Sequence, residues 1–292
     1  DGIRQMLWGF FKKVVVADNC ALFVNGVFEN YQTLDGSTLF LGAFFFTIQI
    51  YGDFSGYSDI AIGCARLFGI DLMQNFKYPY FSRDIAEFWR RWHISLTTWF
   101  RDYIYIPLGG SRAGKWKSFR NTLVIFLVSG FWHGANWTFV AWGAYHALLF
   151  LPLLLLGQNR RYRDSVAENS FLPSVKELTQ MGATFLLVLL GWILFRSEDI
   201  SQAAVYLERM FNVSLFSAPQ LVGLGFGQLL LKKCFFFTAL MFIVEWIGRK
   251  QAHGLMIEDL SLPVRYVIYT VLLIIIYGFD ASNPQGFIYF QF

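Results

Sequence analysis

Charged residues are scarce in this sequence of 292 residues. They make up 15% of the chain, against about 25% in ordinary soluble domains. Hydrophobic residues reach 55%, and phenylalanine alone occurs 33 times. This composition excludes a disordered chain and argues against a water-soluble fold. Together with the apolar spans and the family resemblance described below, it leads to the expected fold class: an all-α protein, a polytopic integral membrane helix bundle with interfacial and re-entrant helices, in a single domain over residues 1–292.

Cysteine is also rare, and the three cysteines lie far apart with no CxxC spacing. A disulfide framework and a zinc site therefore lack support, and no metal is expected. The sequence contains no G-x-S-x-G elbow, H-E-x-x-H pair or Walker A loop, so hydrolase, metalloprotease and NTPase chemistry lose support. No heavily basic exposed domain points to nucleic acid. An initiator methionine and a signal-peptide pattern are missing too, which suggests a fragment or processed chain.

Apolar stretches of membrane length follow one another along the chain. A polar break from Asp53 to Asp59 interrupts one of them. It predicts a broken helix there, either capped by Ser55 or Asp53, or lining a path for solvent. The expected membrane segments cover residues 3–28, 38–52, 57–70, 119–133, 136–156, 179–195, 229–248 and 264–279.

The stretch from residue 76 to residue 120 differs from the rest. It holds nine basic and three acidic residues, so it carries more positive charge than the net +4 of the whole chain. By the positive-inside rule this stretch faces the cytoplasm. Aromatic residues recur at three- and four-residue steps between Ile85 and Tyr103, which predicts one amphipathic helix at the inner interface. Arg90 and Arg91 within it are either interface charges, favoured for at least one of them, or phosphate-binding groups.

His133 stands in the middle of an apolar, aromatic stretch. An ionisable group in such a place suggests a functional site by default, and imidazole suits proton transfer near neutral pH. Gly130 and Gly134 flank it and allow close approach of backbone or substrate. Trp132 and Asn136 offer an aromatic wall and a polar tip for a narrow tunnel. The alternative is a core histidine bound to a neighbouring carbonyl.

The other three histidines carry weaker signals. His93 is evenly balanced between an interfacial residue and a site residue. His146 follows His133 by 13 residues, which on one straight helix is about 20 Å along and about 220° around the axis. The two could share one centre only if the helix breaks, which Gly134 makes possible. His253 lies in a polar loop and is expected to be solvated.

Six long motifs stand out in the sequence: Tyr51 to Asp59, Asn75 to Arg83, Glu87 to Ser95, Trp99 to Gly110, Ser129 to His146 and Gly286 to Phe292. Together they resemble the membrane-bound O-acyltransferase (MBOAT) family, and within it the branch of bacterial alginate O-acetyltransferases and their peptidoglycan-acetylating relatives. Members of that branch carry several more N-terminal helices. The chain therefore resembles the C-terminal part of such a protein.

The resemblance implies a multi-pass protein of the bacterial cytoplasmic (inner) membrane with a tunnel through the bilayer. His133 matches the family's essential histidine in the Trp-His-Gly motif, and His93 is carried over as a second catalytic histidine. An acyl group, preferably acetyl, would pass from a cytoplasmic thioester such as acetyl-CoA to a polysaccharide hydroxyl outside, directly or through a periplasmic or secreted acetyltransferase. Membrane lipids and polysaccharide-assembly proteins would be partners. The expected substrate or tunnel residues are Trp132, Asn136, Asp53, Arg90 and Arg91.

Three other functions stay open at this point. A sister branch of the family transfers D-alanine to teichoic acid. A transporter or channel would also have broken spans and buried polar residues, although the sequence shows no inverted repeat. A silent scaffold could dock a periplasmic enzyme, in which case deleting the protein, but not changing His133, would abolish polymer modification.

Overall fold

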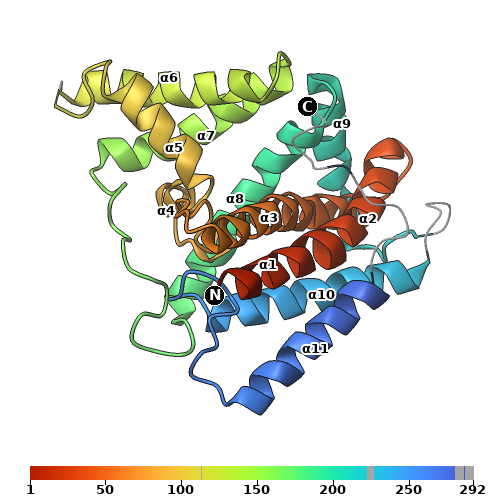
Figure 1. Ribbon diagram of the computed structural model, residues 1–292. Helices are drawn as coiled ribbons and strands as arrows, with labels where there is room; N and C mark the ends of the chain where they lie inside the picture. The colour runs from red at the N-terminus through yellow and green to blue at the C-terminus, as the bar shows by residue number, and fades with distance from the viewer. Residues whose placement is uncertain (113, 222–226, 280–285, 287–292) are drawn as a thin grey trace. The chain divides into compact units, whose positions relative to one another are not determined.

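The computed structural model describes residues 1–112, 114–221, 227–279 and 286, and all regular structure in them is helical (Figure 1). This confirms the predicted all-α class. Two helices, α7 (Trp137–Leu155) and α8 (Val175–Arg196), are long and apolar enough to cross a membrane, and α11 (Leu262–Gly278) is apolar but shorter. The multi-pass topology stays a prediction. The motif at the C-terminus lies outside the described residues except for Gly286.

The chain divides into two compact units. The first consists of Asp1–Gln74 and Tyr206–Phe292, and the second of Asn75–Val205. This division concerns packing within the chain, so the single domain expected over residues 1–292 stays a prediction. Each unit has its own buried aromatic core, and the two are described separately below.

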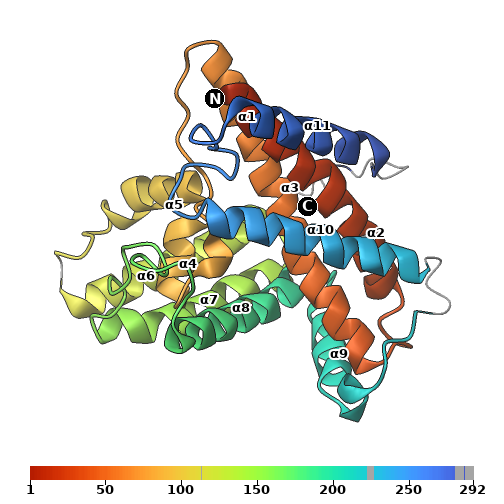
Figure 2. The ribbon, with the colours of Figure 1, turned by 90° about the horizontal axis from the view of Figure 1, so that it is seen from below.

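The first unit is a bundle of long helices. Its first three elements follow one another without a loop and pack along the fourth. Figure 2 shows these elements from below, in red and orange. The elements are α1 (Gly2–Phe10), the π-helix η1 (Phe11–Ala17), α2 (Asp18–Glu29), α3 (Gly36–Leu67), η4 (Val213–Phe216), α10 (Gln228–Ile247) and α11.

Helix α3 runs without interruption for 32 residues. It begins where the Asp35 carboxylate accepts a hydrogen bond of 2.8 Å from the backbone N–H of Thr38, which caps the helix. The break predicted between Asp53 and Asp59 is therefore wrong. The polar side chains need no break because Asp53 pairs with Lys13 at 2.8 Å, and Asp59 pairs with a second lysine of η1.

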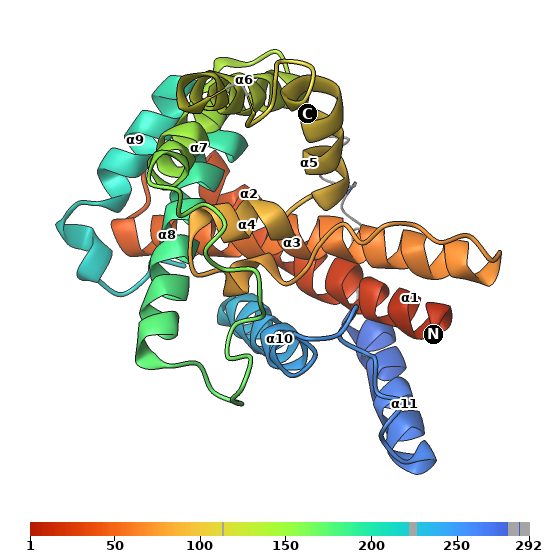
Figure 3. The ribbon, with the colours of Figure 1, turned by 90° about the vertical axis from the view of Figure 1, so that its left-hand side faces the viewer.

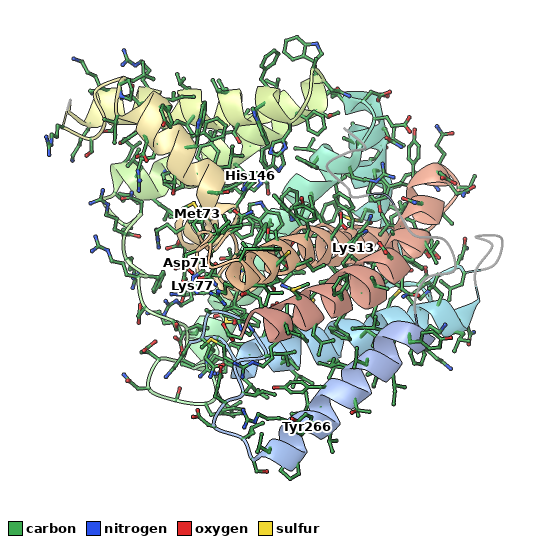
Figure 4. The ribbon with its side chains drawn as sticks, viewed as in Figure 1. Lys13, Asp71, Met73, Lys77, His146 and Tyr266 are labelled. Atoms are coloured by element: carbon green, nitrogen blue, oxygen red, sulfur yellow. The ribbon has the colours of Figure 1, made fainter. Side chains whose placement is uncertain are left out.

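The π-helix η1 supplies both of those lysines. Lys13, labelled in Figure 4, also reaches Asp18 at 2.6 Å, and the two residues are five apart, which is the spacing of a π-helix hydrogen bond. Lys12 donates to the Ser55 hydroxyl at 2.8 Å and lies 2.7 Å from Asp59 and 3.8 Å from Glu245 on α10. The charges in this apolar bundle are thus paired with one another, as buried ionic groups must be.

The second unit holds shorter helices and a pair of long ones. Helices α6 and α7 pack side by side, as Figure 1 shows, and α8 packs against α7. The elements are the short 3₁₀ turn η2 (Pro79–Phe81), α4 (Ile85–Arg91), α5 (Ile94–Phe100), the π-turn η3 (Arg101–Tyr105), α6 (Lys115–His133), α7 and α8. Helix α9 (Ile200–Met210) contains the boundary with the first unit.

The single amphipathic helix predicted from Ile85 to Tyr103 is wrong, because the chain turns between α4 and α5 (Figure 3). Trp92 is buried at this turn, with its ring 5.0 Å from Phe76 and 4.9 Å from Trp192 between centroids. His93 follows in the left-handed region, at φ 46°. A straight helix would place its aromatic side chains in one stripe, whereas the turn lets Trp92 enter the core.

The close packing of α6 on α7 depends on two glycines. A Cβ atom at Gly143 would lie 2.3 Å from the carbonyl oxygen of Phe126, and one at Gly130 would lie 2.2 Å from that of Phe139. Both obstacles are backbone atoms, which cannot rotate away. Gly130, noted in the sequence for its position beside His133, therefore also serves the contact between the two helices.

We expect Gly143→Ala to destabilise the protein by about 1–3 kcal/mol, since the added methyl group must push α6 and α7 apart. Thermal unfolding of the detergent-purified protein measures this as a lower Tm. Gly182→Ala on α8 is the matched control, because a Cβ atom there meets nothing within 4 Å and alanine favours the helix by about 1 kcal/mol over glycine. Equal Tm values for the two variants would contradict the prediction.

Candidate active site

His93 is held in place by a short segment that runs beside the turn between α4 and α5. The Nδ1 atom of its ring lies 3.1 Å from the side-chain oxygen of Asn75. The Phe76 ring is roughly parallel to the imidazole, with 6.4 Å between centroids. A left-handed backbone at a residue other than glycine costs energy and is often retained at functional sites. The unusual φ of His93 fits such a site.

His133 ends α6, where the chain leaves the helix at Gly134. Aromatic rings surround its imidazole: the centroid of Trp132 is 5.0 Å away, that of Trp142 is 5.3 Å away and that of Phe195 is 5.0 Å away. Helices α6, α7 and α8 each contribute one of these rings. The imidazole therefore packs against rings from three helices and is itself partly exposed.

The two histidines and Trp132 lie together in the second unit. The Trp132 ring is 6.4 Å from His93 and 5.0 Å from His133 between centroids. Three of the residues predicted for the site are thus brought together by the fold, although they come from two segments about forty residues apart in the sequence.

His146, labelled in Figure 4, is completely buried near this group. Its ring lies 5.1 Å from the Trp142 ring, the same ring that His133 contacts. The straight helix that would separate the two histidines does not exist, because α6 ends at His133 and α7 begins at Trp137. Among the described residues, neither ring nitrogen of His146 has a hydrogen-bond partner.

The arginines of α4 form structural bonds. Arg91 bonds to Glu87 at 2.7 Å and to the carbonyl oxygen of Asp164 at 2.9 Å, and Arg90 donates to the carbonyls of Asn159 and Tyr162. These contacts tie α4 to the segment before α8. Both interpretations of Arg90 and Arg91, as charges at the membrane interface or as phosphate-binding groups, stay predictions.

Arg83 completes this ionic cluster. Its guanidinium lies 3.0 Å from Glu87, 3.3 Å from the Asp164 carboxylate and 3.5 Å from Glu177. Burial works against the charged form of Arg83, but the hydrogen bond and charge of Glu87 outweigh it and raise the pKa of Arg83 above its ordinary value. The Arg83 guanidinium therefore keeps its positive charge within the cluster.

The remaining predicted site residues lie elsewhere or hold the backbone. Asn136 caps α7 through a 3.1 Å bond from the Thr138 N–H and donates to the Glu198 carbonyl at 2.6 Å. Asp53 belongs to the first unit, where it pairs with Lys13. Contact of either residue with substrate stays a prediction.

Burial lowers the pKa of two histidines outside the apolar spans. The pKa of His93 falls from its ordinary value of 6.5 to about 4, with loss of solvent as the cause. The pKa of His253 also falls to about 4, chiefly through burial. The solvated His253 expected from the sequence is wrong: its ring is 2% exposed, accepts from the Leu255 N–H at Nδ1 and donates from Nε2 to Asp1.

This arrangement of two histidines among aromatic rings coincides with a match to a known family. The model of the membrane-bound O-acyltransferase family matches residues 25–167, which include both His93 and His133. The chain belongs to the membrane-bound O-acyltransferase family, whose members are membrane proteins.

The chain is also similar to several curated proteins. It is 41% identical to a probable alginate O-acetylase of Pseudomonas aeruginosa over 79% of this chain and 43% of the relative. It is 38% identical to a peptidoglycan O-acetyltransferase of Helicobacter pylori over 70% of this chain and 38% of the relative. A teichoic acid D-alanyltransferase of Bacillus subtilis is 29% identical over 68% of this chain and 51% of its own length. The chain spans about half the length of these relatives or less.

Two neighbours of His93 were not anticipated as site residues. Asn75 and Ser95 both bond near its ring. Asn75 is the first residue of one of the motifs that carry the family resemblance, and this position is the sequence feature that could have indicated a role at the site. Nothing in the spacing of residues 75 and 93 indicates contact, because the intervening chain folds through η2 and α4 before it returns.

Proposed function

We propose that this chain is the catalytic part of a multi-pass membrane O-acyltransferase of the bacterial inner membrane. It would transfer an acetyl group from a cytoplasmic thioester, such as acetyl-CoA, to a hydroxyl of an extracytoplasmic polysaccharide, directly or through a periplasmic acetyltransferase. The observation that carries the proposal is the grouping of His93, Trp132 and His133 inside the segment that matches the family.

The chemistry requires a base and no metal. His133 takes the proton from the acceptor hydroxyl while the oxygen attacks the thioester carbonyl carbon. The C–O bond of the new ester forms, the C–S bond breaks, and the proton passes from the imidazolium to the departing sulfur. Aromatic rings around His133 keep water from the thioester, which limits hydrolysis.

The test is acetyl transfer by the purified full-length protein in proteoliposomes with a labelled acetyl thioester inside. Mass spectrometry of the polymer or of a soluble acceptor outside should detect a new acetyl ester. Flux of acetyl groups without ester formation would favour a transporter. Polymer modification in cells that requires the protein but tolerates changes at His133 would favour a scaffold.

D-alanyl transfer to teichoic acid is a second candidate. It is favoured by the similarity to relatives named for that reaction, one of which, from Streptococcus thermophilus, is 38% identical over half of this chain. The same assay with a D-alanyl thioester discriminates the two, since the product ester then carries an amine. Preference for the acetyl donor would support our proposal over this one.

The burial of His93 predicts how the rate of acetyl transfer and the stability of the protein depend on pH. Because its pKa in the folded protein is about 4, a reaction that needs neutral His93 should stay constant from pH 7.5 down to about pH 5.5 and fall only as the pH approaches 4. The unfolded chain already binds a proton below its pKa of 6.5, so the stability contributed by neutral His93 is full above pH 6.5 and lost as the pH falls toward 4. Initial rates and Tm values between pH 4 and pH 8 check both trends; a rate that halves near pH 6.5 would contradict the first.

A further inference from the structure

Three hydrogen-bond donors converge on one oxygen beside His93. The side-chain oxygen of Asn75 lies 3.3 Å from the backbone nitrogen of Ser95, 2.9 Å from the Ser95 hydroxyl and 3.1 Å from Nδ1 of His93. The hydroxyl is 3.4 Å from the same Nδ1. These contacts form a closed group of three side chains at the turn between α4 and α5.

The backbone N–H of Ser95 fixes the orientation of the Asn75 amide. A backbone N–H can only donate, so the atom that faces it must be the amide oxygen and not the NH₂ group. That oxygen is an acceptor. Nδ1 of His93 must therefore be the donor in its own contact with this atom, and a neutral imidazole that carries its hydrogen on Nδ1 has its lone pair on Nε2.

Backbone hydrogen bonds hold the Asn75 segment against the residues on both sides of His93. The Asn75 carbonyl accepts a 2.9 Å bond from the Ile94 N–H, next to His93, and the Lys77 N–H donates a 3.0 Å bond to the Arg91 carbonyl. The Arg91 side chain donates to the Lys77 carbonyl at 3.3 Å. Bonds on both sides of the turn thus clamp the segment that carries Asn75 to the residues that flank the imidazole.

We propose that Asn75 is a positioning residue: its side-chain oxygen holds the His93 imidazole in the form with hydrogen on Nδ1, so that Nε2 is the nitrogen that accepts a hydrogen bond during transfer. The role in transfer rests on the proposed function. When Nε2 accepts a hydrogen bond from the acceptor hydroxyl, Nδ1 keeps its hydrogen and its bond to Asn75, while His133 takes the proton of that hydroxyl and passes it to the departing sulfur. The imidazole therefore needs no rotation within the cycle.

The tautomer is tested directly by ¹⁵N NMR of histidine-labelled full-length protein at pH 7.5. The chain has four histidines, and His93→Gln assigns the signal. We expect a pyrrole-type nitrogen at Nδ1 and a pyridine-type nitrogen at Nε2, and in Asn75→Ala a shift toward the opposite tautomer or a mixture. A wild-type spectrum with hydrogen on Nε2 would overturn the proposal, whatever reaction the protein performs.

Kinetics of the transfer reaction test the consequence. Loss of a group that orients a metal-bound histidine lowers metal affinity or activity by about 10–100-fold, and by analogy we expect Asn75→Ala to lower kcat by a factor of that order with little change in KM. Asn75→Asp still accepts from Nδ1–H, so it should recover most of kcat. Its negative charge raises the pKa of His93, which should move the acidic limb of the rate profile up by about one pH unit or more.

Asn121→Ala is the matched control. Asn121 is a fully buried amide of the same unit that donates to the Leu108 carbonyl at 3.0 Å and lies on α6 away from the turn at His93. It should leave the tautomer and the pH profile unchanged. A merely structural Asn75 would lower stability in Asn75→Ala without moving the pH limb in Asn75→Asp, and that result would overturn the proposal. Full activity of His133→Ala would instead reject the proposed function and leave the NMR test of Asn75 valid.

Discussion

Replacing His133 by alanine is expected to abolish detectable acetyl transfer. Positioned acid–base catalysis contributes about 10²–10⁴ in rate, and the alcohol is a poor nucleophile without a base. The side chain packs against rings from three helices, but it ends α6 and does not support the helix interior. The variant should therefore still insert and fold. The measurement is the initial rate of ester formation by equal amounts of purified protein in proteoliposomes.

Two further variants make this result interpretable. His133→Gln keeps a hydrogen-bonding side chain of similar size without the basic nitrogen, so it should be as inactive as the alanine variant. His253→Gln changes a buried histidine of the other unit and should retain activity. Normal transfer by His133→Ala in reconstituted protein would exclude His133 as the base.

The second large effect is expected on stability, from Lys12→Met. Lys12 is 3% exposed and lies within 4 Å of Asp59 and Glu245, while the Tyr51 hydroxyl bonds the Glu245 carboxylate at 2.9 Å. Removing the amine leaves two carboxylates in an apolar bundle without their cation. Breaking a buried ion pair in this way costs about 3–5 kcal/mol. Thermal unfolding in detergent should show a large fall in Tm.

The same helix bundle offers the controls for this prediction. Lys232→Met on α10 removes an exposed lysine and should change Tm little. Adding Glu245→Gln to Lys12→Met removes one of the uncompensated charges, so the double variant should be more stable than the single one. A single variant as stable as the wild type would show that the pairing in the structure does not hold the bundle together.

Composition, the apolar spans and the family resemblance were enough to predict the all-helical class, but not where the helices are interrupted. Asp53 and Asp59 lie in an apolar run of the sequence. Charged residues that interrupt such a run favour a broken helix when only the local sequence is considered. The partners that make a continuous α3 possible, Lys12 and Lys13, lie about forty residues earlier in the chain. Their amines reach α3 from a π-helix, and the hydrophobic periodicity of the sequence does not predict a π-helix there. Tertiary pairing thus overrode the local signal.

The site was predicted in part because its histidines stand in motifs. His133 is conspicuous in an apolar stretch, and Trp132 is its neighbour in sequence, so both could be named. The aromatic spacing around His93 indicated a helix, yet burial of Trp92 turns the chain there and gives His93 its unusual backbone. Asn75 could not be placed beside it, since that contact depends on the path through η2 and α4.

The number of residues in the π-helix η1 determines how α1 is rotated relative to α2. In an ordinary helix each residue adds about 100° of rotation, so losing or gaining one residue between Phe11 and Ala17 would rotate everything before it by that angle relative to α2. Gly9, where a Cβ would lie 2.6 Å from the Gly56 carbonyl oxygen, would then turn away from α3 and present a bulkier neighbour in its place. Insertions and deletions in this short stretch should therefore be far less tolerated than substitutions.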